Sequence, residues 1–264
     1  MSKLVPYLGG KKLLTKTILS LLPEHRLYCE PFAGSATILL EKVPSPAEVI
    51  NDINGEIVNL FRIVQTHQEE FLRCIRWNLR SRQEFLRLKN SLPAMLTDIQ
   101  RAARLYYLMR AGYSGIGKYF SGKIIGSHRP FSIYRIEETL YEIHLRLENV
   151  TIEHLPYADC IGRYDGPDAL FYLDPPYYGC ENYYGAGIFA REDFTSLAAL
   201  LRQISGRFLL SLNDTPEVRL LFAGFPFLEV STSYTSGTHC GHDKKARELL
   251  IANYDLSQAS QKAT

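Results

Sequence analysis

Four consecutive residues, Asp174-Pro175-Pro176-Tyr177, carry the strongest chemical signal in the sequence. They follow an apolar run, 169–173, that is typical of a strand buried on both faces. Two prolines in a row cannot continue a strand or a helix, so they predict a rigid, extended loop. We expect its aromatic ring to stack on a flat heterocycle. Its carboxylate and proline carbonyls can accept hydrogen bonds from an amino group of that heterocycle. The nitrogen lone pair can then attack an electrophile.

A second group of residues is typical of a nucleoside site. Residues 28–36 (Tyr-Cys-Glu-Pro-Phe-Ala-Gly-Ser-Ala) follow a predicted strand and open a predicted helix over 37–41, and the turn at Gly34 lets a ligand approach the backbone. Asp52, 18 residues beyond Gly34, ends the next strand. A carboxylate at that point can accept hydrogen bonds from both hydroxyls of a ribose. With one glycine the loop is a poor pyrophosphate cradle, so it favours a nucleoside cofactor over NAD. An ordinary turn with an Asp cap is the alternative.

The elements that must position these residues read as an α/β fold. Short β-like runs alternate with helical stretches, which predicts a mostly parallel sheet with strands at 26–29, 48–51, 150–154, 169–173, 207–212, 226–231 and 248–253. Between 54 and 147 the pattern is helical, with helices expected at 56–64, 69–79 and 99–109. We therefore predict one domain from residues 1–60 and 136–264, interrupted by a helical insertion over residues 61–135.

The charge is distributed unevenly along the 264 residues. The segment 73–135 has thirteen Lys and Arg residues against Glu84 and Asp98, so it carries +11 and the remainder carries −9, given the net +2 of the chain. A basic block in an acidic chain predicts binding to a polyanion. A solvated helix face is the alternative, but such a face interleaves both signs to gain i,i+4 pairs.

Several classes of protein are disfavoured by composition. The five cysteines are far apart and form no Cys-x-x-Cys pair, which argues against a disulfide framework or zinc finger and suits a reducing cytoplasm. No apolar run fits a signal peptide or a membrane span. Residues 238–242 (Thr-His-Cys-Gly-His) contain metal-ligand types without a fourth ligand, so we expect a loop and no metal. Tyr106, Tyr107 and Tyr141, at helical spacing, are expected in the core.

Taken in order, these motifs resemble the Dam-type, D12 class of DNA adenine methyltransferases along nearly the whole chain. The pieces that carry the resemblance are Tyr7-Leu8-Gly9-Gly10-Lys11, Glu30-Pro31-Phe32-Ala33-Gly34-Ser35, Asn51-Asp52-Ile53-Asn54, Asp174-Pro175-Pro176-Tyr177, Ser211-Leu212-Asn213-Asp214 and Glu248-Leu249-Leu250-Ile251-Ala252-Asn253.

The resemblance implies a Rossmann-like methyltransferase sheet with S-adenosylmethionine as cofactor and a target-recognition insertion over 61–135. It implies methyl transfer to the N6 amine of adenine in double-stranded DNA by base flipping. The catalytic residues would be Asp174, Pro175, Pro176 and Tyr177, with Asp174 and Pro175 receiving the amine and Tyr177 stacking on the base. The cofactor would contact Tyr7, Lys11, Phe32, Gly34, Asp52, Asp159 and Asp174.

The insertion departs from the family pattern. Where many members carry a Phe-Asn-Gly-Leu-Tyr-Arg-like hairpin, residues 110–120 read Arg-Ala-Gly-Tyr-Ser-Gly-Ile-Gly-Lys-Tyr-Phe, so recognition of GATC is not carried over. We expect base contacts from this loop and only phosphate contacts from the helical arginines, among them Arg80 and Arg82. The residues expected to bind DNA are Arg110, Tyr113, Ser114, Lys118, Lys123 and Arg129.

The expected partner is double-stranded DNA, with no membrane and no obligate protein partner, in a cytoplasmic setting. A cognate restriction endonuclease, the recognition sequence and the oligomeric state stay open. Other classes are weighed against this interpretation. A cytosine amino-methyltransferase usually has Ser or Thr before Pro-Pro-Tyr, and enzymes for protein glutamine or RNA more often have Asn. Asp174 favours adenine. A silent DNA-binding module is disfavoured by the intact motifs, and a dehydrogenase by the missing pyrophosphate loop.

Overall fold

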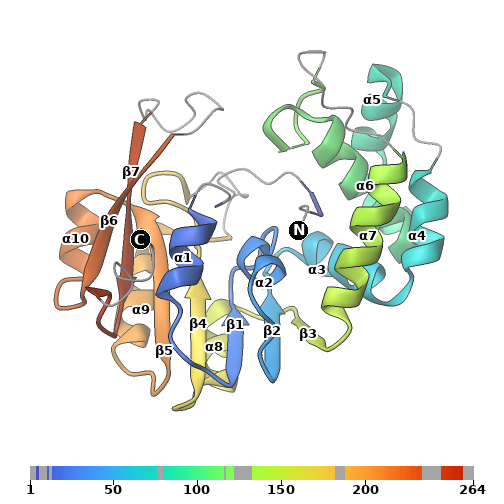
Figure 1. Ribbon diagram of the computed structural model, residues 1–264. Coiled ribbons are helices and arrows are strands. Elements are labelled where there is room, and N and C mark those ends of the chain that lie inside the picture. Colours follow the sequence, from blue (N-terminus) through green and yellow to red (C-terminus); the bar gives the residue numbers. More distant parts are fainter. Residues whose placement is uncertain are drawn as a thin grey trace. The chain divides into compact units, whose positions relative to one another are not determined.

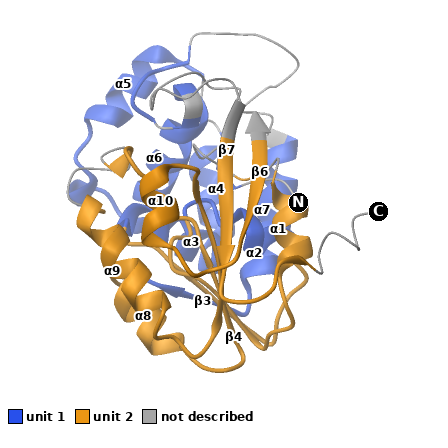
Figure 2. Cartoon of the chain, turned by 90° about the vertical axis from the view of Figure 1, so that its left-hand side faces the viewer, with its two compact units in different colours: residues 1–10, 34–41, 54–154 blue, residues 11–33, 42–53, 155–264 orange. Residues whose placement is uncertain are grey.

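The computed structural model describes residues 4–5, 11, 14–76, 80–115, 117–121, 133–181, 188–233 and 245–257. The chain divides into two compact units (Figure 2). Unit 1 comprises residues 1–10, 34–41 and 54–154, and unit 2 comprises residues 11–33, 42–53 and 155–264. The insertion over 61–135 and its role in DNA binding stay predictions.

A seven-stranded sheet, in the order β3-β2-β1-β4-β5-β7-β6, forms within the described part of the chain (Figure 1). Strands β2, β1, β4 and β5 pair in parallel, whereas β7 is antiparallel to both β5 and β6. The predicted α/β fold with a mostly parallel sheet is confirmed. The strands are β1 (Leu27–Glu30), β2 (Ala47–Asn51), β3 (Val150–Glu153), β4 (Ala169–Leu173), β5 (Arg207–Asn213), β6 (Phe227–Ser233) and β7 (Lys245–Ala252).

The parallel pairing brings the carboxyl ends of four strands to one edge of the sheet. Cys29 of β1 is aligned with Phe171 of β4, and Leu173 at the end of β4 is aligned with Leu210 of β5. Loops that leave this edge are where open α/β sheets bind ligands. The motifs after β1, β2 and β4 therefore leave from the same edge.

The core of unit 2 forms around β4, which is buried along its whole length as its apolar run predicts. Aromatic and aliphatic side chains such as Phe171, Phe194 and Leu197 pack together in this core. Helix α1 lies on one face of the sheet, and α8, α9 and α10 lie on the other (Figures 1 and 2). The helices of unit 2 are α1 (Thr15–Leu21), α8 (Tyr157–Tyr164), α9 (Arg191–Leu201) and α10 (Pro216–Leu221).

Unit 1 is mainly helical. The side chain of Thr97 caps α6 together with Gln100 in a reciprocal capping box. Asn59 of α3 donates to the Asp98 carbonyl at 2.8 Å, which ties the start of α6 to α3. The helical segments are α2 (Thr37–Glu41), α3 (Gly55–Thr66), α4 (Gln68–Ile75), α5 (Arg82–Asn90), η1 (Pro93–Met95), α6 (Asp98–Ala111), η2 (Tyr113–Gly115) and α7 (Ile133–Leu147).

The tyrosines of unit 1 separate the two faces of its helices. Tyr106 and Tyr107 are buried, and the Tyr106 ring packs edge-on against Phe71 with centroids 5.4 Å apart. Their predicted place in the core is confirmed. The same prediction for Tyr141 is wrong, because this side chain is 58% exposed on α7. Helical spacing alone does not say which face a neighbouring helix covers.

Two further findings concern expectations from composition. In the described part of the chain, no helix has the length and apolarity needed to cross a membrane. Cys29, Cys74 and Cys160 are not in disulfide bonds, whereas Cys180 is disulfide-bonded. The sequence argued against a disulfide framework; the disulfide bond at Cys180 was not anticipated, because separation in sequence does not report distance in space.

Candidate active site

The Asp-Pro-Pro-Tyr loop begins directly after β4. Pro175 and Pro176 are buried, whereas Asp174 and Tyr177 are partly exposed. The Cys180 N–H donates to the Tyr177 carbonyl at 2.8 Å and closes a turn through Gly179, whose φ of +86° suits glycine. The buried prolines therefore anchor the loop, and the two reactive side chains, Asp174 and Tyr177, remain partly exposed.

Lys11 meets this loop with its ammonium group. Its Nζ lies 3.1 Å from Asp174 Oδ1, 2.5 Å from the Tyr177 hydroxyl and 2.9 Å from Glu248 Oε2. The Lys11 side chain is 3% exposed and that of Glu248 is fully buried. A buried charge is stable only when it is paired and hydrogen-bonded. The structure thus brings two predicted site residues, Asp174 and Tyr177, into contact with the buried ammonium of a third, Lys11.

Glu248 and Ser211 are functional candidates that the sequence reading did not identify. Glu248 lies on β7, and Ser211 lies on the adjoining β5 and donates to Glu248 Oε2 at 3.1 Å. Both side chains are buried. In the sequence, Ser211 interrupts one apolar run and Glu248 precedes another. Either position could have indicated a buried polar group, which must find a partner inside the protein.

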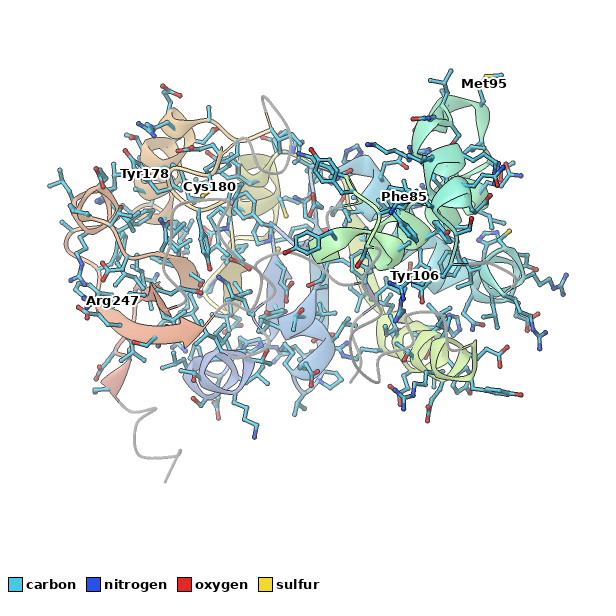
Figure 3. All side chains as sticks on the ribbon, turned by 90° about the horizontal axis from the view of Figure 1, so that it is seen from above. Phe85, Met95, Tyr106, Tyr178, Cys180 and Arg247 are labelled. Carbon is cyan, nitrogen blue, oxygen red and sulfur yellow. The ribbon has the colours of Figure 1, made fainter. Side chains whose placement is uncertain are left out.

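Asn213, two residues beyond Ser211, holds the backbone just after Tyr177. Its Oδ1 accepts from the Tyr178 N–H at 2.9 Å, and its Nδ2 donates to the Tyr178 carbonyl at 3.0 Å. Asn213 is 4% exposed. Figure 3 shows Tyr178 and Cys180 on this stretch of the loop. One amide therefore satisfies both backbone groups of Tyr178 and limits movement of the loop.

Asn51 performs a similar task at the end of β2. Its Nδ2 donates to the carbonyls of Pro31 and Leu155, at 2.9 and 3.0 Å, and its Oδ1 accepts from the Leu155 N–H at 2.8 Å. Its own carbonyl accepts from the Ala33 N–H at 2.9 Å. One buried side chain thus fixes the loop after β1 and the loop before α8.

Four residues predicted to hold the cofactor lie in described parts of the chain. Phe32 is partly buried and stacks on Tyr157, with ring centroids 5.3 Å apart. Asp52 directly follows β2 and is partly exposed, while Gly34 has a positive φ of 49°. Asp159 is exposed in the first turn of α8. Each position is compatible with its predicted role, which stays a prediction.

The interior beside the loop is rich in carboxyl groups. Burial raises the pKa of Tyr172 well above its usual range; Asp174, Glu30 and Glu248 raise it further, and Lys11 opposes them. Among the described residues, the buried Tyr172 hydroxyl has no hydrogen-bond partner. Three carboxyl groups and one ammonium thus act on one buried phenol, which gives this interior an excess of negative charge.

The DNA-reading candidates lie in unit 1. Arg110, at the end of α6, donates to the Tyr106 hydroxyl at 2.5 Å and packs on its ring. Tyr113 is 48% exposed, and Lys118 is exposed. Outside the described part of the chain lie Tyr7, Lys123, Arg129, residues 238–242 and the side chain of Ser114.

The loop that carries Tyr113 and Lys118 is a short hairpin, here defined as residues 111–121. The Tyr113 N–H donates to the Tyr119 carbonyl at 2.7 Å. At Gly112 an added Cβ would lie 2.6 Å from the Leu108 carbonyl oxygen, so only glycine fits. Arg80 donates to the Ser121 carbonyl at 2.8 Å, and Arg82 packs over the Phe120 ring. The two arginines expected to meet phosphates therefore also hold this hairpin.

Comparison with known proteins shows the family of the chain. The sequence profile of the D12 class N6 adenine-specific DNA methyltransferases matches residues 7–236, and the chain belongs to this family. Similar proteins include Type II methyltransferase M1.LlaDCHI of Lactococcus lactis subsp. cremoris, 25% identical over 93% of both chains. The retron Ec67 DNA adenine methylase of Escherichia coli is 24% identical over 96% of this chain and 92% of its own. A DNA adenine methylase of Serratia marcescens is 28% identical over 92% and 94%. The chain is thus an adenine-specific DNA methyltransferase.

Proposed function

We propose that this methyltransferase takes its methyl group from S-adenosylmethionine and transfers it to N6 of an adenine flipped out of double-stranded DNA at a specific sequence. The observation that carries the proposal is the contact of the Lys11 ammonium with both Asp174 and Tyr177. It joins the acceptor of the amine and the ring that stacks on the base into one rigid unit.

The donor set fits S-adenosylmethionine. When bound, this cofactor supplies an electrophilic methyl group on a positively charged sulfur. The excess of carboxyl groups around Tyr172 favours a cationic ligand, and the buried Tyr172 hydroxyl offers a hydrogen bond that none of the described residues uses. Asp52 would hold the ribose hydroxyls, and Phe32 would line the pocket. The other members of the proposed cofactor set are Tyr7, Lys11, Gly34, Asp159 and Asp174.

Asp174 and Pro175 are the proposed acceptors for the two N–H groups of the adenine amine. Accepting both bonds favours a tetrahedral nitrogen, whose lone pair points away from the ring and can form the new N–C bond. Tyr177 stacks on the flipped base and keeps the amine next to Asp174. As the N–C bond forms, the S–CH3 bond would break with its electron pair left on the sulfur, and the surplus proton on N6 would then pass to water. This use of Asp174 is electrostatic stabilisation of charge that develops on nitrogen.

The hairpin 111–121 is the proposed reading element. Tyr113 and Lys118 are exposed on it and offer a stacking ring and a cation to base edges or phosphates. Arg110, Ser114, Lys123 and Arg129 are proposed to contribute from the same region.

One of the similar proteins is named as a Type II methyltransferase and others as DNA adenine methylases, so a restriction partner and a solitary role are both compatible with the family. We place the enzyme in the cytoplasm, where it would meet DNA.

Incubating the enzyme with unmethylated plasmid and methyl-labelled S-adenosylmethionine tests the proposal. Nucleoside analysis should find the label in N6-methyladenine, and mapping should find it within one short sequence. Label in methylcytosine, or adenine labelled without regard to sequence, would overturn it.

A further inference from the structure

We propose that Glu248 is a positioning residue for methyl transfer, which acts through Lys11 to set the orientation of Asp174 and Tyr177. This inference rests on the proposed function of the Asp-Pro-Pro-Tyr loop. The Oε2 atom of Glu248 lies 2.9 Å from Lys11 Nζ.

The burial of Glu248 and Lys11 indicates which of the two residues fixes the position of the other. Lys11 is a long, flexible side chain that loses much rotational freedom when it is fixed in one place. Glu248 is fully buried on β7. The register of β7 is fixed by its pairing with both β5 and β6. A carboxylate on the sheet interior is therefore a stationary anchor for the ammonium. The ammonium in turn has donors directed to Asp174 and to the Tyr177 hydroxyl.

Ser211 supports the anchor from the neighbouring strand. Its hydroxyl donates to the same Glu248 oxygen that accepts from Lys11, at 3.1 Å. Two donors on one oxygen fix the carboxylate rotamer as well as its charge. The chain of contacts runs from Ser211 through Glu248 and Lys11 to the reacting loop.

The test compares kcat and KM for Glu248→Gln, Lys11→Met and the double variant. Glu248→Gln keeps the shape of the side chain and should lower kcat by about tenfold to a hundredfold, the range found when the outer partner of an active-site group is removed. The KM values for cofactor and DNA should change less than kcat, because Glu248 itself is not one of the proposed binding residues. Adding Glu248→Gln to Lys11→Met should lower kcat no further, since a residue that acts through another has no effect without it.

Glu229→Gln is the matched control. Glu229 lies on the adjoining strand β6, is 53% exposed and pairs with Arg219 at 2.6 Å. The same change there should leave kcat at the wild-type value. Losses that multiply in the double variant, or a raised KM for the cofactor with unchanged kcat, would overturn the positioning role.

The melting temperature provides a second test of the coupling between Glu248 and Lys11, and it does not depend on activity. Lys11→Met leaves the buried Glu248 carboxylate without its ion pair, so the double variant should melt at a higher temperature than Lys11→Met alone. An equal or lower Tm would contradict the coupling. If Glu248→Gln does not fold, Ser211→Ala keeps the carboxylate and should still lower kcat, and an unchanged kcat there would refute the proposal. A wild-type enzyme that methylates no adenine would refute the proposed function instead.

Discussion

Asn213→Ala should separate the rigidity of the reacting loop from the stability of the sheet. The substitution removes one accepted and one donated hydrogen bond to Tyr178, at 2.9 and 3.0 Å. At about 1 kcal/mol net for each bond, the free energy of unfolding should fall by about 2 kcal/mol. For a chain of this size that is a drop in Tm of about 4–8 °C. The loss of activity should be larger, because displacing a reacting group by about 1 Å can cost about a hundredfold in rate.

A control with the same chemistry is available at the other end of β5. Asn253 accepts from the Phe208 N–H and donates to the Gly206 carbonyl, both at 2.9 Å, but it touches the start of the strand. Asn253→Ala should cost at most about 2 kcal/mol of stability and leave kcat unchanged. The assay is single-turnover methyl transfer at saturating cofactor and DNA, with thermal unfolding of each variant. Equal losses of kcat in both variants, or none in Asn213→Ala, would refute the role given to Asn213.

Three other predictions address the cofactor, the DNA and pH. Asp52→Ala should weaken S-adenosylmethionine binding by at least roughly tenfold in calorimetry, because it removes charge-assisted bonds worth about 1.5–3 kcal/mol each; an unchanged Kd would contradict the ribose contact. In competition binding, Lys118→Ala should reduce discrimination against single-mismatch duplexes by about 1–3 kcal/mol, whereas a uniform loss for all sequences would indicate phosphate contact only. Burial lowers the pKa of His25 from 6.5, so protonation of the unfolded chain should reduce stability as the pH falls below 6.5. Urea unfolding at pH 5.5 and 7.5 should show this loss in wild type and a smaller one in His25→Gln.

The parts of the fold that the sequence predicts well are those with a strong local pattern. The strand 169–173 and the helix 37–41 have the predicted bounds, since an apolar run ended by Asp-Pro-Pro and a short helix after a small-residue loop are both local signals. The bounds of the last strand are predicted less accurately. Strand β7 begins at Lys245, three residues before the apolar run at Glu248, because pairing with β6 extends it beyond the apolar residues.

The site was predictable for residues to which a motif assigns a chemical role, whereas Glu248 and Asn213 lie in matching segments that assign them none. Asp174, Tyr177 and Lys11 each lie in a recognisable segment, and the structure brings them together. Glu248 lies 237 positions from Lys11 along the chain, and no local pattern reports that pairing. Asn213 looks like an ordinary strand end until the loop that it holds is known. Such supporting residues satisfy buried polar groups across the fold, so they become visible only with the tertiary structure.

The most direct measurement of Asp174 as the amine acceptor is the single-turnover rate of N6-methyladenine formation by wild type and by Asp174→Ala on the same DNA. Asp165, whose carboxylate accepts from the Ser205 and Gly206 backbone near the start of β5, provides the control variant Asp165→Ala. Removing an acceptor that stabilises the transition state should slow Asp174→Ala by at least about a hundredfold. The rate of Asp165→Ala should remain close to wild type. A folded Asp174→Ala enzyme that methylates adenine at a near-normal rate would contradict the account.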